Sequence, residues 1–457
     1  MPADPLAALR TRSYLVLLVL AAIIGAPISA AAYFFLALVT KLQGWIFSSL
    51  PHALGFHTEP MWWPVLPLLL AGVLVPPAIK YLPGTGGHRP AEGFKAGGTP
   101  GPAELPGVVL AALATLSLGV VLGPEAPLIA LGGGLGVCAM RLAKRDAPDR
   151  ATTMVAAAGS FAAISTLLGS PLLGAFLLME ASGLGGATLE LVLMPGLLSA
   201  GIGSLIFIGL DSATGLGTFS LAIPHLPHLG PPTVGEFGWA IVIGLAATLV
   251  GTGIRWLGLF LQDRTQRWTM LAAPLIGLAI AGLAIAYAAG TGKGSSEVLF
   301  SGQDALGPLI DHASGYTVGA LVLLLVCKGL AYGGSLSSFR GGPIFPAMFL
   351  GAAGGIALSH LPGLPLVAGA AMGIGAMTAV LLRLPFTAVL LATLLLSSDG
   401  LQVMPLAIVA VVVAYVASAR LMPVPAKEPE AAQEPAPAQG PAQGPAQGPA
   451  PAGRTPS

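Results

Sequence analysis

The fold of this chain is decided by a short stretch, Gly123-Pro124-Glu125-Ala126-Pro127, and by its near-copy, Gly342-Pro343-Ile344-Phe345-Pro346. Extended into the apolar residues that follow, the two blocks read GPEAPLIALG and GPIFPAMFLG, with Gly, Pro, Pro, Leu and Gly at equal spacing. Each block has a Gly-Pro break and then a proline that suits the first turn of a helix. A helix that begins inside a membrane has unpartnered N–H groups and a positive dipole end, which attract an anion. Two such broken helices, one in each half, predict an ion site near the membrane midplane.

The similarity between the halves continues downstream of the two blocks. When Pro171 is set against Pro385, Gly159 also aligns with Gly373. Ordered matches over two consecutive segments indicate an internal duplication. That the two repeats are inverted is inferred from the general rule for transporters built in this way.

The composition predicts an all-α polytopic membrane protein. The chain is 55% hydrophobic and 9% charged, with a mean hydropathy of +0.85, whereas soluble domains carry roughly 25% charged residues. The 63 glycines allow close helix packing in lipid. Some apolar stretches are too short to span a bilayer, so we expect broken and tilted helices buried in protein. The apolar stretches are Tyr14–Val39, Trp62–Ile79, Leu105–Leu122, Pro124–Met140, Met154–Leu168, Leu189–Leu210, Trp239–Leu261, Met270–Ala289, Val318–Tyr332, Ile344–Ala357, Leu366–Leu382, Phe386–Leu396 and Val403–Ala419.

Composition and charge also divide the chain into regions. Arg10 and Arg12 precede the first apolar run, which predicts a cytoplasmic N-terminus, and that run lacks a signal-peptide cleavage pattern. After Met422 the sequence becomes a Pro/Ala/Gln/Gly tail that cannot bury a core. The expected regions are 1–12, a short cytoplasmic N-terminus; 13–211, the first membrane repeat; 212–235, a connecting loop; 236–422, the second membrane repeat; and 423–457, a disordered tail.

Several functional classes are excluded by what the sequence lacks. It has no nucleophile–base pair, no His/Glu metal spacing and no phosphate-binding loop, so we expect neither an enzyme nor a metal site or other cofactor. Cys138 and Cys327 both lie inside apolar runs and are interpreted as small core residues. No nucleic-acid partner is expected. The predicted location is a plasma (inner) membrane, with the lipid bilayer as the surrounding partner.

With its flanking segments, the block around Glu125 resembles the CLC family of chloride channels and proton-coupled chloride exchangers. The family signature G-K/R-E-G-P is matched in its Gly, Glu and Pro at 123–127, and G-x-F-x-P falls at 342–346 with Phe one place late. G-S-G-I-P is matched more loosely by Gly86-Gly87-His88-Arg89-Pro90, or by the overlapping 84–86. The resemblance covers roughly 14–420. It implies a CLC-like inverted repeat, a homodimer with one pore per subunit, and chloride as the transported ligand.

The same resemblance implies roles for particular residues. Glu125 would be the gate, its carboxylate occupying the anion site until it swings out or takes a proton. The alternative is that Glu125 merely caps its own helix. The expected chloride-binding residues are Gly123, Pro124, Glu125, Ala126, Gly342, Ile344, Phe345, Gly86, Gly87 and His88.

Departures from the family pattern bear on the mechanism. Exchangers of the family carry two adjacent glutamates where this chain has Glu180-Ala181, so the proton-accepting position is an alanine. Glu180 is interpreted as a structural, hydrogen-bonded carboxylate, with a proton relay as the alternative. The usual central-site tyrosine has no match, and Tyr415 is a weak candidate for it. Pro343 has no N–H to offer an anion.

The roles of Lys328 and of the His88-Arg89 pair each have two interpretations. Lys328 is expected to snorkel or to pair with a carboxylate, the alternative being that it attracts anions. His88 and Arg89 are either ordinary loop residues or part of the inner mouth. The sequence as a whole predicts chloride transport gated by Glu125, by channel-like passive conduction. The alternatives are a proton-coupled chloride exchanger or a transporter of fluoride or another anion.

Overall fold

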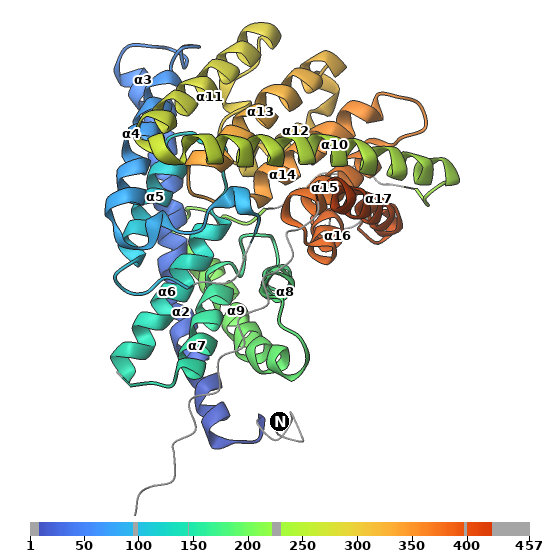
Figure 1. Ribbon diagram of the computed structural model, residues 1–457. Helices are drawn as coiled ribbons and strands as arrows, with labels where there is room; N and C mark the ends of the chain where they lie inside the picture. The colour runs from blue at the N-terminus through green and yellow to red at the C-terminus, as the bar shows by residue number, and fades with distance from the viewer. Residues whose placement is uncertain (1–8, 95–98, 145, 222–229, 397–399, 423–457) are drawn as a thin grey trace, which may run out of the picture. The chain divides into compact units, whose positions relative to one another are not determined.

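The computed structural model describes residues 9–94, 99–144, 146–221, 230–396 and 400–422. The regular elements in these ranges are all helical (Figure 1). The first half contains α2 (Arg12–Gly44), η1 (Trp45–Ser49), α3 (Leu50–Ala53), α4 (Val65–Tyr81), η2 (Pro83–Gly86), η3 (Pro90–Glu92), α5 (Leu105–Ser117), α6 (Glu125–Ala143), α7 (Asp149–Ala163), α8 (Pro171–Ser182) and α9 (Gly186–Thr214). The second contains α10 (Val234–Thr265), η4 (Gln266–Trp268), α11 (Thr269–Thr291), η5 (Ser295–Glu297), α12 (Gln303–Asp311), η6 (Ala313–Gly315), α13 (Val318–Ser338), α14 (Ile344–Ser359), α15 (Leu366–Leu382), α16 (Pro385–Leu394) and α17 (Gly400–Leu421).

The fold class predicted from the sequence is confirmed. Every predicted apolar stretch lies largely on a helix, and within the described ranges six helical segments are long and apolar enough to cross a membrane. Other apolar helices are shorter, among them α5, α8, α14 and α16, as expected for broken helices. The apolar runs did not reveal α12, because this helix of nine residues is amphipathic. The predicted tail 423–457 and parts of the predicted segments 1–12 and 212–235 lie outside the described residues.

Local sequence signals explain where several helices begin and end. The Thr11 side chain caps α2 by accepting a hydrogen bond from the Tyr14 amide at 3.2 Å. Ser170 caps α8 in the same way, and Pro171 occupies the first turn, where its missing N–H costs nothing. Gly183 then ends α8 in the left-handed conformation that glycine adopts readily.

The two halves contain equivalent helix pairs that meet at glycines. In the first half α6 packs against α7, and a methyl group added to Gly132 would collide with the Gly159 carbonyl. In the second half α14 packs against α15, and a methyl group on Gly351 would collide with the Gly373 carbonyl. Gly159 and Gly373 are the pair aligned in the sequence, so the matched glycines make the same close backbone contact in both halves.

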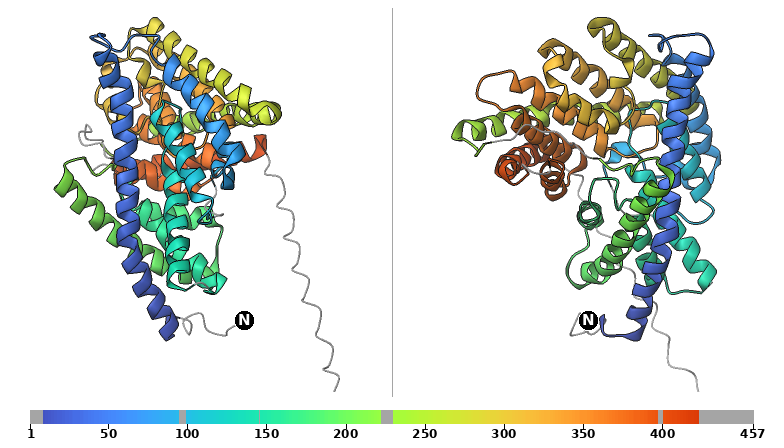
Figure 2. Two further views of the ribbon diagram at one scale, coloured as in Figure 1. Left: turned by 90° about the vertical axis from the view of Figure 1, so that its left-hand side faces the viewer. Right: turned by 180° about the vertical axis from the view of Figure 1, so that it is seen from behind.

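Long helices support these pairs on both sides. In the first half α2 runs alongside α9 and α7, and in the second α10 packs against α13, α15 and α17 (Figure 2). The starts of α6 and α14 lie in the buried interior between these supports, since Glu125, Ile344 and Phe345 have at most 1% of their surface exposed.

Candidate functional site

The two Gly-Pro blocks meet directly in the structure. The Gly123 amide donates to the Gly342 carbonyl at 2.7 Å, and the Gly342 amide donates back to the Gly123 carbonyl at 2.5 Å. Pro124 and Pro343 follow as the N-cap residues, so α6 and α14 begin next to this bridge. The positive ends of two helices from opposite halves of the chain therefore lie side by side.

Glu125 places its carboxylate at this junction. Its side chain is fully buried, and Oε1 accepts a hydrogen bond from the Phe345 amide at 2.7 Å. Among the described residues, Oε2 has no hydrogen-bond partner. Glu125 therefore occupies the N-terminal anion position of α14, the helix of the other half, rather than acting only on its own helix.

The two bridging glycines make room for that carboxylate. A Cβ atom on Gly123 would lie 2.6 Å from the Glu125 Cδ, and one on Gly342 would lie 2.7 Å from it. Both distances are far below van der Waals contact, so any side chain at either position would displace the carboxylate. The need for glycine here comes from close approach rather than from an unusual backbone angle.

Tyr332 is a residue of this site that the sequence did not reveal. It lies on α13, is fully buried, and its hydroxyl donates to the Pro343 carbonyl at 2.8 Å. The sequence signal was a lone tyrosine in an apolar helix, which ordinarily indicates a core residue. Tyr415, the weak candidate for a central tyrosine, lies on α17 and interacts electrostatically with Arg383.

Cavities lie on both sides of the Glu125 block. One, of about 460 Å³, is bordered by Leu122 and Pro124 and by the segment 296–305. Another, of about 280 Å³, is bordered by Ala126 and Gly341 and by the segment 84–88. The Glu125 block therefore borders two separate spaces.

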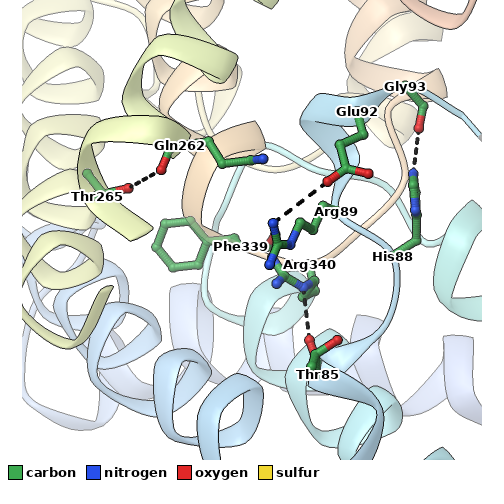
Figure 3. A network of polar contacts seen from close by, with 9 residues as sticks. All are labelled: Thr85, His88, Arg89, Glu92, Gly93, Gln262, Thr265, Phe339 and Arg340. Atoms are coloured by element: carbon green, nitrogen blue, oxygen red, sulfur yellow. Dashed lines mark hydrogen bonds and ion pairs between the residues drawn. The ribbon is translucent and has the colours of Figure 1, made fainter. Parts of the chain in front are cut away.

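The predicted residues Gly86, Gly87 and His88 all border the smaller cavity. Their loop turns through left-handed conformations, with φ of +82° at Gly84, +70° at Gly86 and +94° at Gly87, angles that glycine adopts at little steric cost. The His88 ring nitrogen Nε2 lies 2.6 Å from the Gly93 carbonyl oxygen (Figure 3).

Glu180 is bound to another helix. Its carboxylate accepts hydrogen bonds from the amides of Phe386 at 2.9 Å and Thr387 at 2.7 Å, and from the Thr387 hydroxyl at 2.6 Å. It thus caps the N-terminus of α16, which has no side-chain cap of its own. Ala181, the next residue, is only partly buried and carries no ionisable group.

The burial and the hydrogen-bond partners of Lys328 differ from those predicted from the sequence. It is fully buried, so the expectation that it snorkels is wrong. Its ammonium group donates to the backbone carbonyls of residues 297–300, at 2.9, 3.1, 3.0 and 3.3 Å, and forms no salt bridge to a carboxylate of the described residues. It also lies 4.5 Å from the centre of the Phe349 ring. Lys328 thereby fixes the segment that borders the cavity of about 460 Å³ beside the Glu125 block.

The two cysteines lie on helices of opposite halves, Cys138 on α6 and Cys327 on α13. Cys138 is partly buried and Cys327 is buried, and neither forms a disulfide. In the described ranges no three His, Cys, Asp or Glu side chains are grouped closely enough to hold a metal ion.

Comparisons with known proteins agree on one family. The model of the voltage-gated chloride channel family matches residues 78–419. The "Putative ion-transport protein YfeO" of Salmonella paratyphi A is 30% identical over 363 residues, which cover 78% of this chain and 84% of that protein. The protein of the same name from Escherichia coli O1:K1 is 28% identical over 362 residues, covering 78% and 82%.

Solved structures share the fold. A slow cyanobacterial Cl⁻/H⁺ antiporter matches with a TM-score of 0.67 at 20% identity, covering 89% of this chain and 94% of that one. A CLC-type fluoride/proton antiporter matches with a TM-score of 0.63 at 20% identity, covering 88% and 95%. The family match extends over most of the chain and includes both Gly-Pro blocks. The chain therefore belongs to the voltage-gated chloride channel (CLC) family, whose members are anion-transporting membrane proteins and not enzymes.

Proposed function

We propose that the protein conducts chloride passively across its membrane and that Glu125 is the gate. The observation that carries this proposal is the hydrogen bond from the Phe345 amide to Glu125 Oε1, at 2.7 Å in a fully buried site. The carboxylate occupies the position that a chloride ion would take at the start of α14. Protonation or rotation of Glu125 would free the position for an anion from either cavity.

Selectivity for anions would come from backbone dipoles. The amides of Ile344 and Phe345 lie in the first turn of α14, and Ala126 lies in the first turn of α6. Dipoles of this kind bind an anion weakly enough for it to leave quickly. Pro124 and Pro343 supply no N–H, so the site has fewer donors than two unbroken amide runs would give. The proposed chloride-binding residues are Gly123, Pro124, Glu125, Ala126, Gly342, Ile344, Phe345, Gly86, Gly87 and His88.

Two features support passive conduction over proton exchange. Ala181 stands where exchangers of the family carry their proton acceptor, and it cannot bind a proton. Glu180, the alternative relay, already accepts three hydrogen bonds from α16. Proton-coupled exchange of chloride or fluoride is the second candidate, because two structures of the same fold are described as Cl⁻/H⁺ and F⁻/H⁺ antiporters.

The assembly that we propose is a homodimer in a plasma (inner) membrane, with membrane repeats at 13–211 and 236–422. Large apolar side chains are exposed on the outer helices of both halves, for example Leu205 on α9 at 68% and Val412 on α17 at 52%. Such surfaces are suited to lipid or to a second copy of the chain.

Flux from proteoliposomes tests the proposal. Purified protein in vesicles loaded with potassium chloride should release chloride when valinomycin carries the compensating potassium, whereas protein-free vesicles should not. Without valinomycin, and with a proton carrier instead, potassium should remain inside. Potassium release in the absence of chloride would contradict anion selectivity, and an absence of chloride release from folded protein would contradict conduction.

A further inference from the structure

Arg340 is a buried cation beside the proposed pathway that has no role in the function described above. It directly precedes Gly341-Gly342 in the second block, and only 6% of its surface is exposed. Its side chain borders two cavities, the one of about 280 Å³ next to Ala126 and a larger one of about 500 Å³. Thr85 borders both cavities as well, so the two spaces share Arg340 and Thr85 as lining residues. Figure 3 shows these two residues with the hydrogen bond that joins them.

No carboxylate pairs directly with Arg340 among the described residues, and the favourable electrostatic influence of Glu92 on it is opposed by that of Arg89. Nε donates to the Thr85 carbonyl at 3.2 Å and Nη1 donates to the Phe339 carbonyl at 3.1 Å. In the described part of the chain no carboxylate oxygen lies within salt-bridge distance of Arg340, whereas Glu92 pairs with Arg89 at 3.8 Å. A guanidinium group stays charged in proteins and has five N–H donors, of which carbonyls take two here. A charge buried in this way is costly unless an anion pairs with it.

The larger cavity is electrostatically suited to collect anions. Lys80, Arg89 and Arg267 border it together with Arg340, and none of its described lining residues is Asp or Glu. The hydroxyl-bearing residues Ser337 and Ser338 also line it. The smaller cavity has one acidic lining residue, Glu104, whose Oε2 accepts a hydrogen bond from the Gly101 amide at 2.9 Å. Clefts lined by one sign of charge raise the local concentration of the opposite ion.

We propose that the Arg340 guanidinium binds a small inorganic anion of the halide class beside the two cavities that it borders. This site is separate from the helix-dipole position at Glu125 and supplies the fixed cation that the dipole site lacks. Its place in transport rests on the proposed function: an anion would pass from the larger cavity to Arg340 and then, by the smaller cavity, to the start of α6. Arg340 would set how strongly chloride is taken up from this side.

The competing role for Arg340 is purely structural. Through its bond to the Thr85 carbonyl, it could simply hold the turn at 84–87 against the second block. If this role is the only one, Arg340→Gln should lower the melting temperature by the same amount in the presence and in the absence of chloride. An anion site predicts instead that chloride raises the melting temperature and that this increase depends on Arg340.

The experiment compares wild-type protein with Arg340→Gln, Arg340→Lys and the control Arg264→Gln, whose arginine is exposed and lines neither cavity. Bromide binding is located by anomalous scattering in crystals grown in bromide. The melting temperature in detergent is measured in chloride and in gluconate at one ionic strength.

We expect bromide density at the wild-type guanidinium and its loss in Arg340→Gln. The half-saturating chloride concentration for flux should rise about tenfold in that variant, as expected for a lost hydrogen bond to a charged group.

Arg340→Lys keeps the positive charge but lacks the planar guanidinium group, so it should retain part of the bromide binding. Bromide binding to this variant tests the proposal even if Arg340→Gln does not fold. The control should behave as wild type. A wild-type guanidinium without bromide, or equal chloride dependence in Arg340→Gln and wild type, would overturn the proposal while leaving chloride conduction intact. Bromide bound at Arg340 in a protein that conducts no anion would instead overturn the proposed function and leave this site standing.

Discussion

The Phe345 amide donates a hydrogen bond to Glu125 Oε1 at 2.7 Å, joining residues 220 positions apart in the chain. The bond places a carboxylate from the first half in the helix-start position of the second half. A carboxylate and a halide ion compete for the same N–H groups, because both are anions that a helix N-terminus stabilises. The predictions below follow from the competition at this position and from the contacts that shape it.

Glu125→Gln should keep or raise chloride flux and should flatten its dependence on pH. In the wild type, a falling pH protonates the carboxylate, which removes the competing charge, so flux should rise as pH falls. The amide of glutamine is neutral at every pH and resembles the protonated acid. Chloride flux from proteoliposomes over a range of pH measures this effect.

The matched control is Glu236→Gln. Glu236 is also buried, at 6% exposure, but it lies in the first turn of α10, where it accepts a hydrogen bond from the Thr233 hydroxyl at 3.0 Å. This variant should keep the pH dependence of the wild type. A steep pH dependence that persists in folded Glu125→Gln would reduce Glu125 to a helix cap.

Gly342→Ala should displace the Glu125 carboxylate. The added methyl group would lie 2.7 Å from Cδ, and such overpacking typically costs about 1–3 kcal/mol. We expect a lower melting temperature together with a weaker pH dependence of flux, because the carboxylate can no longer settle at the start of α14. The control is Gly253→Ala on α10, where the methyl group meets nothing within 4 Å. If Gly342→Ala matched this control in both measurements, the close contact would be unimportant.

Tyr332→Phe should destabilise the start of α14. The change removes the 2.8 Å hydrogen bond to the Pro343 carbonyl and leaves a buried acceptor unpaired, at a cost of about 1–3 kcal/mol. Because Pro343 directly precedes the amides that bind Glu125, chloride affinity should change as well. Thermal unfolding and the half-saturating chloride concentration measure the two effects. Tyr81→Phe, at a side chain that is 70% exposed, should alter neither.

Lys328→Met should impair folding more than any of these changes. The ammonium group donates to four consecutive carbonyls, and an apolar side chain would leave them buried without that donor. We expect a melting temperature lower by many degrees, or little folded protein, as judged by size-exclusion chromatography and thermal unfolding. Lys41→Met, at an exposed lysine near the end of α2, is the control. A folded Lys328→Met protein of unchanged stability would refute this structural role.

Proline and glycine made the helix starts predictable from the sequence. The sequence prediction placed helix starts at Pro124 and Ile344, and the structure begins α6 at Glu125 and α14 at Ile344. The Gly-Pro break favours a boundary here, because glycine and proline both disfavour a helix interior, whereas proline fits the first turn of a new helix. The apolar runs were equally clear, since a bilayer imposes both their composition and their length.

The partners of the polar side chains could not be predicted in the same way. Arg340 Nε donates a hydrogen bond to the carbonyl of Thr85, 255 positions away in the chain. The Tyr332 hydroxyl on α13 donates to the carbonyl of Pro343, which precedes α14. A lone tyrosine or lysine in an apolar run gives no sign of its acceptor. Lys328 illustrates this, because its acceptors are backbone carbonyls, which carry no signature in the sequence.

Proton coupling is the last prediction, and it separates the two candidate functions. To reach Glu125 from the aqueous phase, a proton needs a relay, and Ala181 cannot provide one. The Glu180 carboxylate is held by the amides of Phe386 and Thr387. We therefore expect that a chloride gradient will not drive protons uphill, as measured by a pH electrode outside chloride-loaded vesicles with potassium and valinomycin setting the voltage. Glu180→Gln should lower the melting temperature, because it removes the charge that caps α16, and should leave proton flux unchanged. Sustained uphill proton movement would establish the exchanger, and loss of that movement in Glu180→Gln would identify Glu180 as its relay.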